Sequence, residues 1–217
     1  MKEILESISW FDFVVIGFLV AGILRGRKRG MSQELIDVFM WVGIVVGSAL
    51  GYKLVGSLIN QKTGLELLWS NVLGYFAIVL VLLIIESILD KLFHDMLVGS
   101  DIFGVLEYPL GMLSGAIRFL CMLLLMLALL NAKLVTDAER LAEIEKQKKE
   151  LGKTYFPTLG EIQDSIFNKS ISGKFIKNNL SWCLIQSVPS QTPPAVRRQN
   201  EKSIKDQKQR MIDSLTK

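Results

Sequence analysis

The sequence predicts an all-α integral membrane protein, with a four-transmembrane-helix bundle followed by an amphipathic helical C-terminal tail. Three observations predict this class. Half of the 217 residues are hydrophobic, only 21% are charged and the mean hydropathy is +0.38, which is too apolar for an ordinary water-soluble domain. Four long runs within residues 1–132 are almost free of charge. The charges are also uneven, because residues 1–130 carry 9 Lys/Arg and 11 Asp/Glu, whereas residues 131–217 carry 16 and 10.

The first predicted span covers residues 8–24 and is the shortest, with Asp12 near its start. A cleaved signal peptide is the alternative for this segment. Its first residues are not clearly basic, however, no small-residue cleavage motif follows, and the run ends in the basic residues 25–29. We therefore expect a helix that is retained in the mature protein.

The other three spans are predicted from their length, because crossing about 30 Å of hydrocarbon takes about 20 helical residues. Residues 67–89 begin with nineteen uncharged residues and form the cleanest span. Residues 35–52 are interrupted only by Asp37, and residues 108–132 only by Arg118. Residues 1–132 are accordingly predicted to form one membrane domain.

Basic residues beside the spans predict the orientation. Arg25, Arg27, Lys28 and Arg29 form the densest basic cluster next to any span, and short loops rich in Lys and Arg stay in the cytoplasm. With four spans, both termini then lie on the opposite side. Basic residues after the fourth span favour the reverse orientation, but a long translocated tail obeys this rule less strictly.

The remaining residues are predicted to form two parts, an amphipathic helical segment at 133–188 and a basic, disordered tail at 189–217. Within the segment, a charged helix is expected from Asp137 to Lys153, and one or two short amphipathic helices at residues 159–184 around a break at Ser172-Gly173. These helices could lie on the membrane, pack on the bundle or meet a partner, and we prefer packing on the bundle. Anionic lipid headgroups account for the basic tail without invoking nucleic acid.

Few residues offer catalytic or metal-binding chemistry. Two cysteines, Cys121 and Cys183, exclude a disulfide-rich scaffold and a four-cysteine metal site, and His94 is the only histidine. Cys121 lies in an apolar run and His94 has no evident nucleophile beside it. Glu86 and Asp90 lie one helical turn apart, and a cation or proton site there is a minor alternative. We expect no cofactor, no metal and no enzymatic activity.

Glycines recur at every fourth position and are predicted to lie on helix-packing faces. One series is Gly43, Gly47 and Gly51 in the second span, and another is Gly111 and Gly115 in the fourth. Glycines four residues apart share one helix face, where a bare backbone allows a neighbouring helix to approach closely. The sequence leaves open whether that neighbour belongs to the same chain or to a second copy.

Charged residues within the spans are the most informative polar residues, because each costs a few kcal/mol in lipid. Arg118 lies near the middle of the fourth span and Asp12 lies at a comparable depth in the first. We therefore expect an Asp12–Arg118 ion pair, which either fixes helix register or lines a polar path.

Acidic residues gather at the predicted cytoplasmic ends of the spans. We expect them to be interfacial and to pair with the basic loop at 25–29. They are Glu34, Asp37, Glu86, Asp90, Asp95, Asp101 and Glu107.

Two short motifs resemble the colicin V production (CvpA) family of bacterial membrane proteins. The first is Ser9-Trp10-Phe11-Asp12 before an apolar helix, followed by Arg29-Gly30 and Glu34. The second is the segment Gly111 to Arg118, with Glu107 four residues upstream. The family usually has Asp in place of Glu107 and glycine in place of Phe119. The positions that match the family's motifs are Asp12, Arg29, Gly30, Glu34, Glu107, Gly111, Gly115 and Arg118.

The resemblance implies a multi-pass protein of the bacterial cytoplasmic (inner) membrane that is linked to colicin V production or export and to envelope homeostasis, with no agreed catalytic activity. We expect an accessory protein that contacts an envelope or export partner, or a second copy of itself. The alternative is a small oligomeric channel or transporter that uses Asp12 and Arg118.

Overall fold

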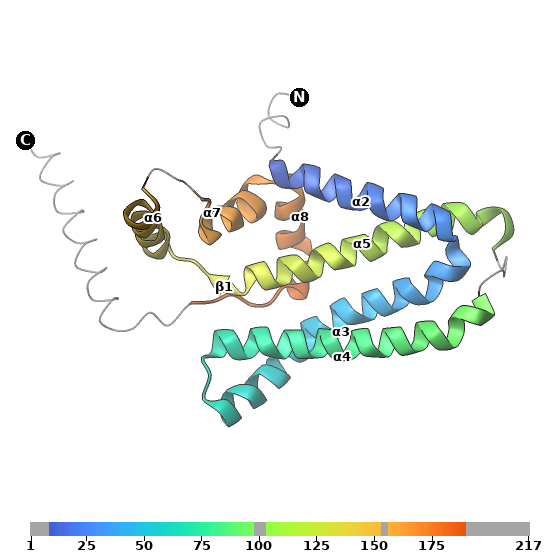
Figure 1. Cartoon of the computed structure of the whole chain (residues 1–217), viewed down its shortest axis with the longest axis horizontal. Coiled ribbons are helices and arrows are strands. Elements are labelled where there is room, and N and C mark those ends of the chain that lie inside the picture. Colours follow the sequence, from blue (N-terminus) through green and yellow to red (C-terminus); the bar gives the residue numbers. More distant parts are fainter. Residues whose placement is uncertain (1–8, 98–102, 153–155, 190–217) are drawn as a thin grey trace, which may run out of the picture.

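Four long helices form most of the chain in the computed structural model, which describes residues 9–97, 103–152 and 156–189 (Figure 1). They are α2 (Trp10–Arg29), α3 (Met31–Thr63), α4 (Leu67–Leu97) and α5 (Glu107–Asn131), with the short 3-10 helix η1 (Gly104–Leu106) before α5. The C-terminal elements are β1 (Lys133–Leu134), α6 (Asp137–Leu151), α7 (Leu159–Asp164), the π-helical turn η2 (Ser165–Lys169), α8 (Ile171–Asn179), η3 (Ser181–Cys183) and β2 (Val188–Pro189). Of the tail predicted at 189–217, Pro189 ends β2, and residues 190–217 lie outside the described residues.

Three of these helices are long and apolar enough to cross a membrane. They comprise Met31–Thr63, Leu67–Leu92 and Gly104–Asn131, and they confirm the predicted second, third and fourth spans. The first span is not among them. Between Asp12 and Arg25, α2 has only twelve uncharged residues, which cover about 18 Å at 1.5 Å per residue. The count of four spans therefore stays a prediction.

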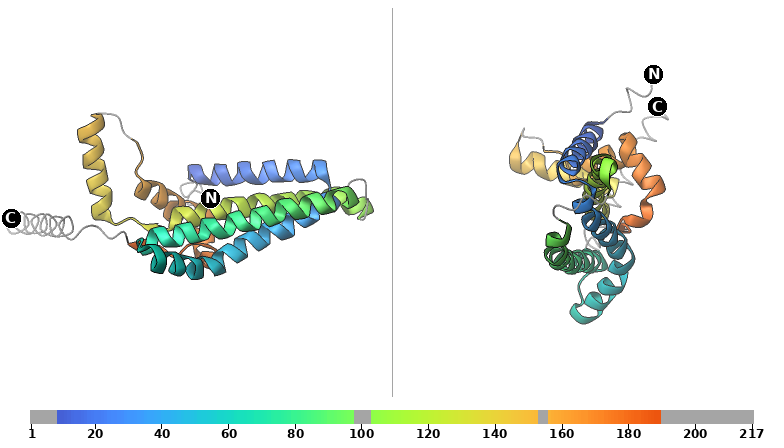
Figure 2. Two further views of the ribbon diagram at one scale, coloured as in Figure 1. Left: turned by 60° about the horizontal axis from the view of Figure 1, so that its bottom comes forward. Right: turned by 90° about the vertical axis from the view of Figure 1, so that its right-hand side faces the viewer.

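The four helices lie in a row, in the order α2, α5, α3, α4, instead of closing into a square bundle (Figures 1 and 2). In this row α5 is covered by α2 on one side and α3 on the other, whereas α4 packs mainly on α3. A large part of the apolar surface of α4 is exposed as a result, as at Leu80, Ile84 and Ile88. In a bilayer, such a surface meets lipid or another membrane protein.

Glycines hold α2 and α5 in backbone contact. A Cβ atom added to Gly22 would lie 2.5 Å from the carbonyl oxygen of Gly115, and one added to Gly111 would lie 2.6 Å from that of Gly26. The two helices therefore run antiparallel, with Gly22 beside Gly115 and Gly26 beside Gly111. This contact agrees with the packing face that the sequence predicts for the fourth span.

The glycine series of the second span forms the predicted packing face only in part. A Cβ atom on Gly43 would meet nothing within 4 Å, and those on Gly47 and Gly51 would meet only the ends of Leu82 and Ile78 on α4. The prediction is wrong for Gly43, which is exposed and has no described neighbour within 4 Å of its Cβ position. Backbone contact between α3 and α4 occurs instead between Gly56 on α3 and Gly74 on α4, two glycines outside the repeating series.

The segment after α5 packs on the bundle. Ile166, Phe167, Ile176 and Ile185 are buried and belong to the same hydrophobic core as the inner face of α5. The chain then returns to the end of α5, where β2 pairs in parallel with β1. The sequence left three placements open for this segment: on the membrane, on the bundle or against a partner. In the structure the segment packs on the bundle.

The helix break expected at Ser172-Gly173 lies slightly earlier. Ser170 is the N-cap of α8, and its hydroxyl oxygen accepts a hydrogen bond from the backbone N–H of Gly173 at 2.8 Å. Gly173 lies inside the helix, where a Cβ atom would overlap the carbonyl of Ile166. This glycine therefore marks a close approach between α8 and η2, and not the end of a helix.

Candidate functional site

A tight turn at Gly30 brings the end of α2 beside the start of α3. Gly30 has φ of +81°, a value that favours glycine. One turn of helix later, Glu34 and Asp37 lie three residues apart on α3, so both carboxylates project toward the same side. The α5 helix passes along that side, where the hydroxyl of Ser114 donates to the backbone carbonyl of Glu34 at 3.3 Å.

These elements assemble a buried ion network of Arg29, Glu34, Asp37 and Arg118, which we call the Arg118 network. Nη1 of Arg118 lies 3.3 Å from Oε2 of Glu34 and makes a shorter contact with Oδ2 of Asp37. Nη1 of Arg29 lies 3.1 Å from Oδ2 of Asp37 and 3.6 Å from Oε1 of Glu34. Three helices therefore bring two guanidinium groups and two carboxylates together, and the charges of the two pairs of groups offset each other.

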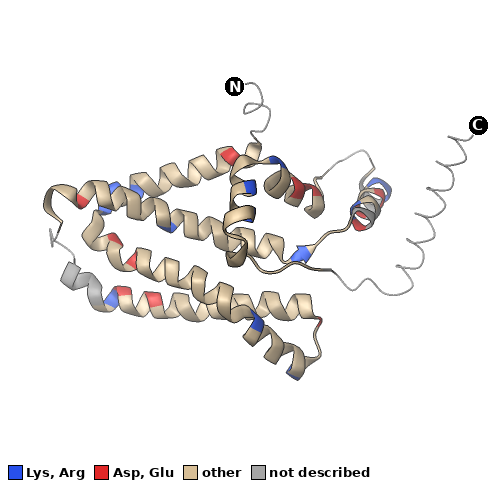
Figure 3. Cartoon of the chain, turned by 180° about the vertical axis from the view of Figure 1, so that it is seen from behind, with Lys and Arg blue, Asp and Glu red and all other residues tan. Residues whose placement is uncertain are grey.

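The Arg118 network lies inside the row of helices. The side chains of Glu34, Asp37 and Arg118 are 0%, 5% and 11% exposed, whereas that of Arg29 is 39% exposed. Figure 3 shows the acidic residues of α3 and α4 gathered toward the end of the molecule where α2 meets α3. A charge buried this deeply is tolerated when it is paired, and each carboxylate here has two cationic partners.

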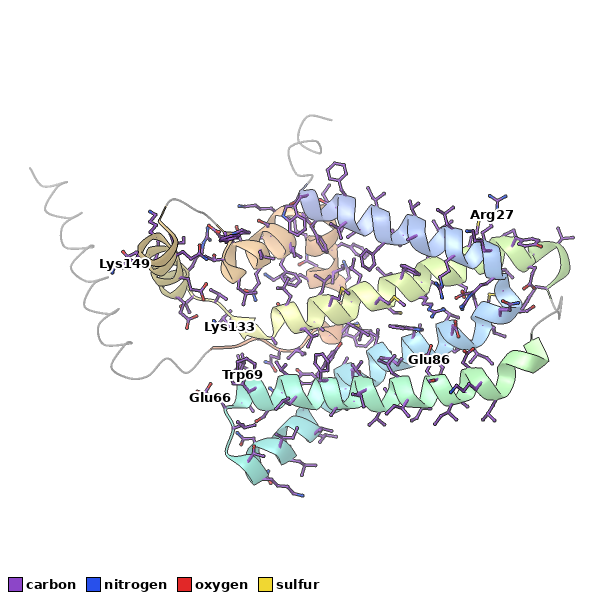
Figure 4. All side chains as sticks on the ribbon, viewed as in Figure 1. Arg27, Glu66, Trp69, Glu86, Lys133 and Lys149 are labelled. Carbon is purple, nitrogen blue, oxygen red and sulfur yellow. The ribbon has the colours of Figure 1, made fainter. Side chains whose placement is uncertain are left out.

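Two further side chains border the network. The guanidinium carbon of Arg118 lies 5.8 Å from the ring centroid of Trp41, within the range of a cation–π interaction. Glu86 on α4 lies within electrostatic range of Asp37 and Arg118 (labelled in Figure 4). Glu86 thereby adds a third carboxylate near the guanidinium group of Arg118.

Hydrogen bonding in the network is incomplete. Oε1 of Glu34 and Nε of Arg118 are buried and have no hydrogen-bond partner among the described residues. Buried polar groups in proteins are normally satisfied, and ordered water is the usual partner where protein offers none. Oε1 of Glu34 and Nε of Arg118 are the atoms that an ordered water would satisfy.

Glu107, the first residue of α5, lies beside the first turn of α3. Its carboxylate accepts hydrogen bonds from the backbone N–H of Ser32 at 2.6 Å and from the hydroxyl of Ser32 at 2.8 Å. It therefore caps the N-terminus of α3, where a negative charge is favourable. A Cβ atom on Gly30 would lie 2.5 Å from Oε1 of Glu107, so Gly30 supplies both the turn and the space for this carboxylate.

The predicted Asp12–Arg118 pair is wrong. The glycine contacts place residue 19 opposite Arg118, seven residues beyond Asp12, or about 10 Å along the axis at 1.5 Å per residue. Asp12 instead accepts backbone N–H groups from Ser9 at 2.8 Å and from Ser172 at 2.9 Å, and a longer one from Ile171 at 3.4 Å. Its carboxylate thus caps α2 and joins it to the first turn of α8.

The acidic residues expected at the cytoplasmic ends follow different patterns. Glu34 and Asp37 pair with the basic loop as predicted, and among the described residues the loop cation that they contact is Arg29. Glu107 pairs with Ser32. The side chain of Asp95, with that of His94, and the whole of Asp101 lie outside the described residues.

Metal-binding and nucleophilic groups are sparse in the described part of the chain, where no group of three or more His, Cys, Asp or Glu residues is placed to hold a metal ion. Cys121 and Cys183 are buried free thiols. Burial raises the pKa of the Cys183 thiol, which disfavours the reactive thiolate.

Long apolar helices and a buried ion network together define a multi-pass helical membrane protein. The family model of the Colicin V production protein matches residues 11–149, which is more than half of the chain and includes the whole Arg118 network. The chain belongs to this family, and the resemblance drawn from its motifs is confirmed. No curated protein and no solved structure gave a significant match.

Proposed function

We propose that the chain is an accessory protein of the bacterial cytoplasmic (inner) membrane with both termini in the periplasm. In this proposal it supports the production or export of a colicin V-type toxin and the integrity of the envelope. It acts through contacts with other membrane proteins or a second copy of itself, without a catalytic step or a cofactor of its own. The family match supports the link to toxin production.

One observation carries the accessory role: the charges within the helices are bound by groups of the same chain. Arg118 contacts Glu34 and Asp37. The carboxylate of Asp12 accepts hydrogen bonds from backbone N–H groups at the starts of α2 and α8. The carboxylate of Glu107 caps the N-terminus of α3. Charges engaged in this way fix the positions of helices. A protein that transmits contacts between partners needs this rigidity, whereas a carrier needs charges that change partners.

The edge of the helix row supports contact with a partner. The α4 helix packs mainly on α3, and its opposite face exposes Leu80, Ile84 and Ile88, each at least half exposed. Helices in membranes associate through van der Waals packing of such faces. This face is the surface on which we expect the partner to lie.

Deletion of the gene in a strain that produces colicin V tests the proposal. We expect less toxin in the medium, unchanged toxin synthesis inside the cell, and a leakier envelope, all restored by the wild-type chain. A photo-crosslinking residue at Ile84 should capture a component of the toxin export apparatus or a second copy, whereas the same residue at Leu124, which is buried, should not. Unchanged secretion after deletion would overturn the proposal, and capture at neither position would overturn its mechanism.

A small oligomeric channel or transporter remains the second candidate because of the unsatisfied polar atoms beside Arg118. Water held there, together with Glu86, would provide a hydrated route for a proton or a small ion into the row of helices. Asp12 takes no part in this route, since it lies about 10 Å away along the axis. Flux through proteoliposomes that is lost in Glu86→Gln but kept in Glu66→Gln would favour it, and flux no greater than that of empty vesicles would exclude it.

A further inference from the structure

The described part of the chain contains a cavity of about 240 Å³ at the end of the row where α5 stops. Its lining comes from several separate elements, namely the end of α5, β1, α6, α7, η2 and α8. Asn131, which lines the cavity, is also the last residue of the candidate membrane span Gly104–Asn131. One wall of this cavity therefore lies where the span ends.

Three basic side chains line the cavity, each from a different element: Lys133 from β1, Arg140 from α6 and Lys177 from α8. The carboxylates that form ion pairs with the first two lie outside the lining, Glu143 at 3.7 Å from Lys133 and Glu161 at 3.9 Å from Arg140. Asp164 of the lining also lies within electrostatic range of Arg140. Ion pairs this long and partly exposed are weak. The two cations are therefore free to turn toward an anion in the cavity.

The remaining charged groups of the lining are Lys177 and Asp164. Among the described residues, Nζ of Lys177 donates only to a neutral acceptor, the side-chain oxygen of Asn168 at 3.1 Å. The one lining carboxylate, Asp164, receives a hydrogen bond from Asn168 at 2.8 Å and an ion pair from Lys169 at 3.3 Å. Because Lys169 offsets the charge of Asp164, the cationic lining groups favour an anionic ligand.

Tryptophans indicate the depth of the cavity in the membrane. Trp10, Trp69 and Trp182 lie toward the same end of the molecule as Lys133 and are 54%, 57% and 53% exposed. Figure 4 labels Trp69 and Lys133 near one another at this end. Because exposed tryptophans concentrate at the level of the lipid headgroups, this end of the row is expected to lie at headgroup depth.

We propose that this cavity binds the phosphate of an anionic phospholipid headgroup. The phosphate oxygens accept hydrogen bonds from the ammonium groups of Lys133 and Lys177 and from the guanidinium group of Arg140. A site of this kind would fasten the C-terminal segment to the membrane surface at the end of α5. It differs from attraction of lipid by the basic tail, since all three cations lie before residue 189.

Native mass spectrometry of the full chain in detergent, titrated with phosphatidylglycerol or phosphatidylcholine, tests the proposal. The test variant is Lys133→Gln/Arg140→Gln/Lys177→Gln. Its control, Lys148→Gln/Lys149→Gln/Lys174→Gln, removes three exposed charges outside the lining. Each cation near anionic lipid is worth about fivefold in binding, so we expect phosphatidylglycerol to bind the test variant at least about tenfold more weakly and the control nearly as well as the wild type.

Equal losses in both triple variants, or none in the test variant, would overturn the site. Inorganic phosphate and glycerol 3-phosphate serve as soluble competitors. Displacement of phosphatidylglycerol by either at equal concentration would show a site for free phosphate and would overturn the lipid assignment. If the test variant does not fold, Lys177→Gln alone, whose side chain is exposed, is compared with Lys174→Gln, with equal binding again overturning the site.

Discussion

Arg118 is the residue on which the ion network depends. It is the more deeply buried of the two cations of the network, since its side chain is 11% exposed and that of Arg29 is 39% exposed. Glu34 and Asp37 therefore owe most of their compensation in the low-dielectric interior to a single guanidinium group. Removal of one partner from a buried ion pair leaves an uncompensated charge and costs more than the pair itself contributes.

We expect Arg118→Met to destabilise the folded protein by about 3 kcal/mol or more, measured by thermal or denaturant unfolding in detergent micelles. Addition of Asp37→Asn should recover a large part of this loss, because it removes one of the stranded charges. Addition of Asp12→Asn should recover none, because Asp12 binds backbone groups elsewhere. Rescue by Asp12→Asn in preference to Asp37→Asn would contradict the network.

Sequence reasoning identified the residues of the network but paired Arg118 with the wrong one. The predicted Asp12–Arg118 pair assumes that the depth of a residue in the bilayer follows from its position along a straight span. It also assumes that every span crosses the same thickness of hydrocarbon. Glu34 and Asp37 were placed at the membrane interface, because the predicted second span began at residue 35. In the structure α3 begins at Met31, one residue after the turn at Gly30, and runs back beside α5. The depth of a residue does not determine which helices pack against each other, because helix neighbours depend on how the helices pack.

At the scale of elements, the contact between α2 and α5 is made by backbone atoms. Four glycines meet in two pairs, and a side chain on any one of them would occupy the position of a carbonyl group on the other helix. Such contact lets helices gain dispersion energy in lipid, where there is no hydrophobic force between them. It also leaves no room for adjustment, because main-chain atoms cannot change rotamer.

We expect Gly111→Ala to push α2 away from α5 and to lower the free energy of unfolding by about 1–3 kcal/mol or more. Gly17→Ala and Gly43→Ala are matched controls, since a Cβ atom at either position meets nothing within 4 Å. Those two changes should leave stability unchanged or raise it slightly, because alanine favours the helix. Unfolding in micelles measures all three variants, and equal effects would show that the glycine contact is absent.

The tie between α2 and α8 makes a second prediction at this scale. Asp12→Ala removes the carboxylate that accepts the backbone N–H groups of Ile171 and Ser172, a loss comparable with that of a helix cap at about 1 kcal/mol. Hydrogen exchange of the α8 amides should quicken about fivefold, with little change in α3. Glu66→Ala, at the same end of the molecule but exposed, is the control. Unchanged exchange in α8 would contradict the tie.

Helices were the part of the fold that the sequence predicted best, because run length and hydropathy determine them locally. The charged helix after the fourth span was expected from Asp137 and extends over Asp137–Leu151, with Thr136 and Glu139 forming its capping box. The predicted spans were too short at the polar ends, as for α3, because helices continue past the hydrocarbon. Gly173 was misread because a glycine needed for close packing looks like a glycine that ends a helix.

At the scale of the whole molecule, the direction of each helix fixes which ends lie together. The turn at Gly30 and the start of α5 lie at one end, and the start of α2, residues 63–67 and the end of α5 lie at the other. This arrangement suits termini on one side of the membrane. It does so whether or not α2 spans the full hydrocarbon thickness.

We expect a cysteine introduced at Lys28 to react with impermeant thiol reagents only from the cytoplasm, and one at Lys62 only from the periplasm. Both residues are exposed, and the buried native cysteines provide a low background. A reporter fused after residue 217 should be active in the periplasm. A cytoplasmic reporter with the same loop labelling would mean that the chain crosses the membrane an even number of times after Lys28, instead of the three times expected for α3, α4 and α5.

Family membership and multi-pass character could be predicted from the sequence, because both depend on local motifs and composition. The row of helices and the return of the chain to the end of α5 could not. Both depend on contacts such as that between Lys133 and Val188, which join residues far apart in the chain and have no local signal. The cavity beside Asn131 was missed for the same reason, since its basic residues come from three elements.

Because the two cations of the Arg118 network lie on either side of its carboxylates in the sequence, they become available at different times during synthesis. Glu34 and Asp37 are made just after Arg29, but Arg118 follows 84 and 81 residues later. At about 5–20 residues per second this delay lasts roughly 4–16 s. During this interval Arg29 is the one member of the network that can accompany the two carboxylates into the membrane, and Arg118 completes the network when α5 emerges from the ribosome.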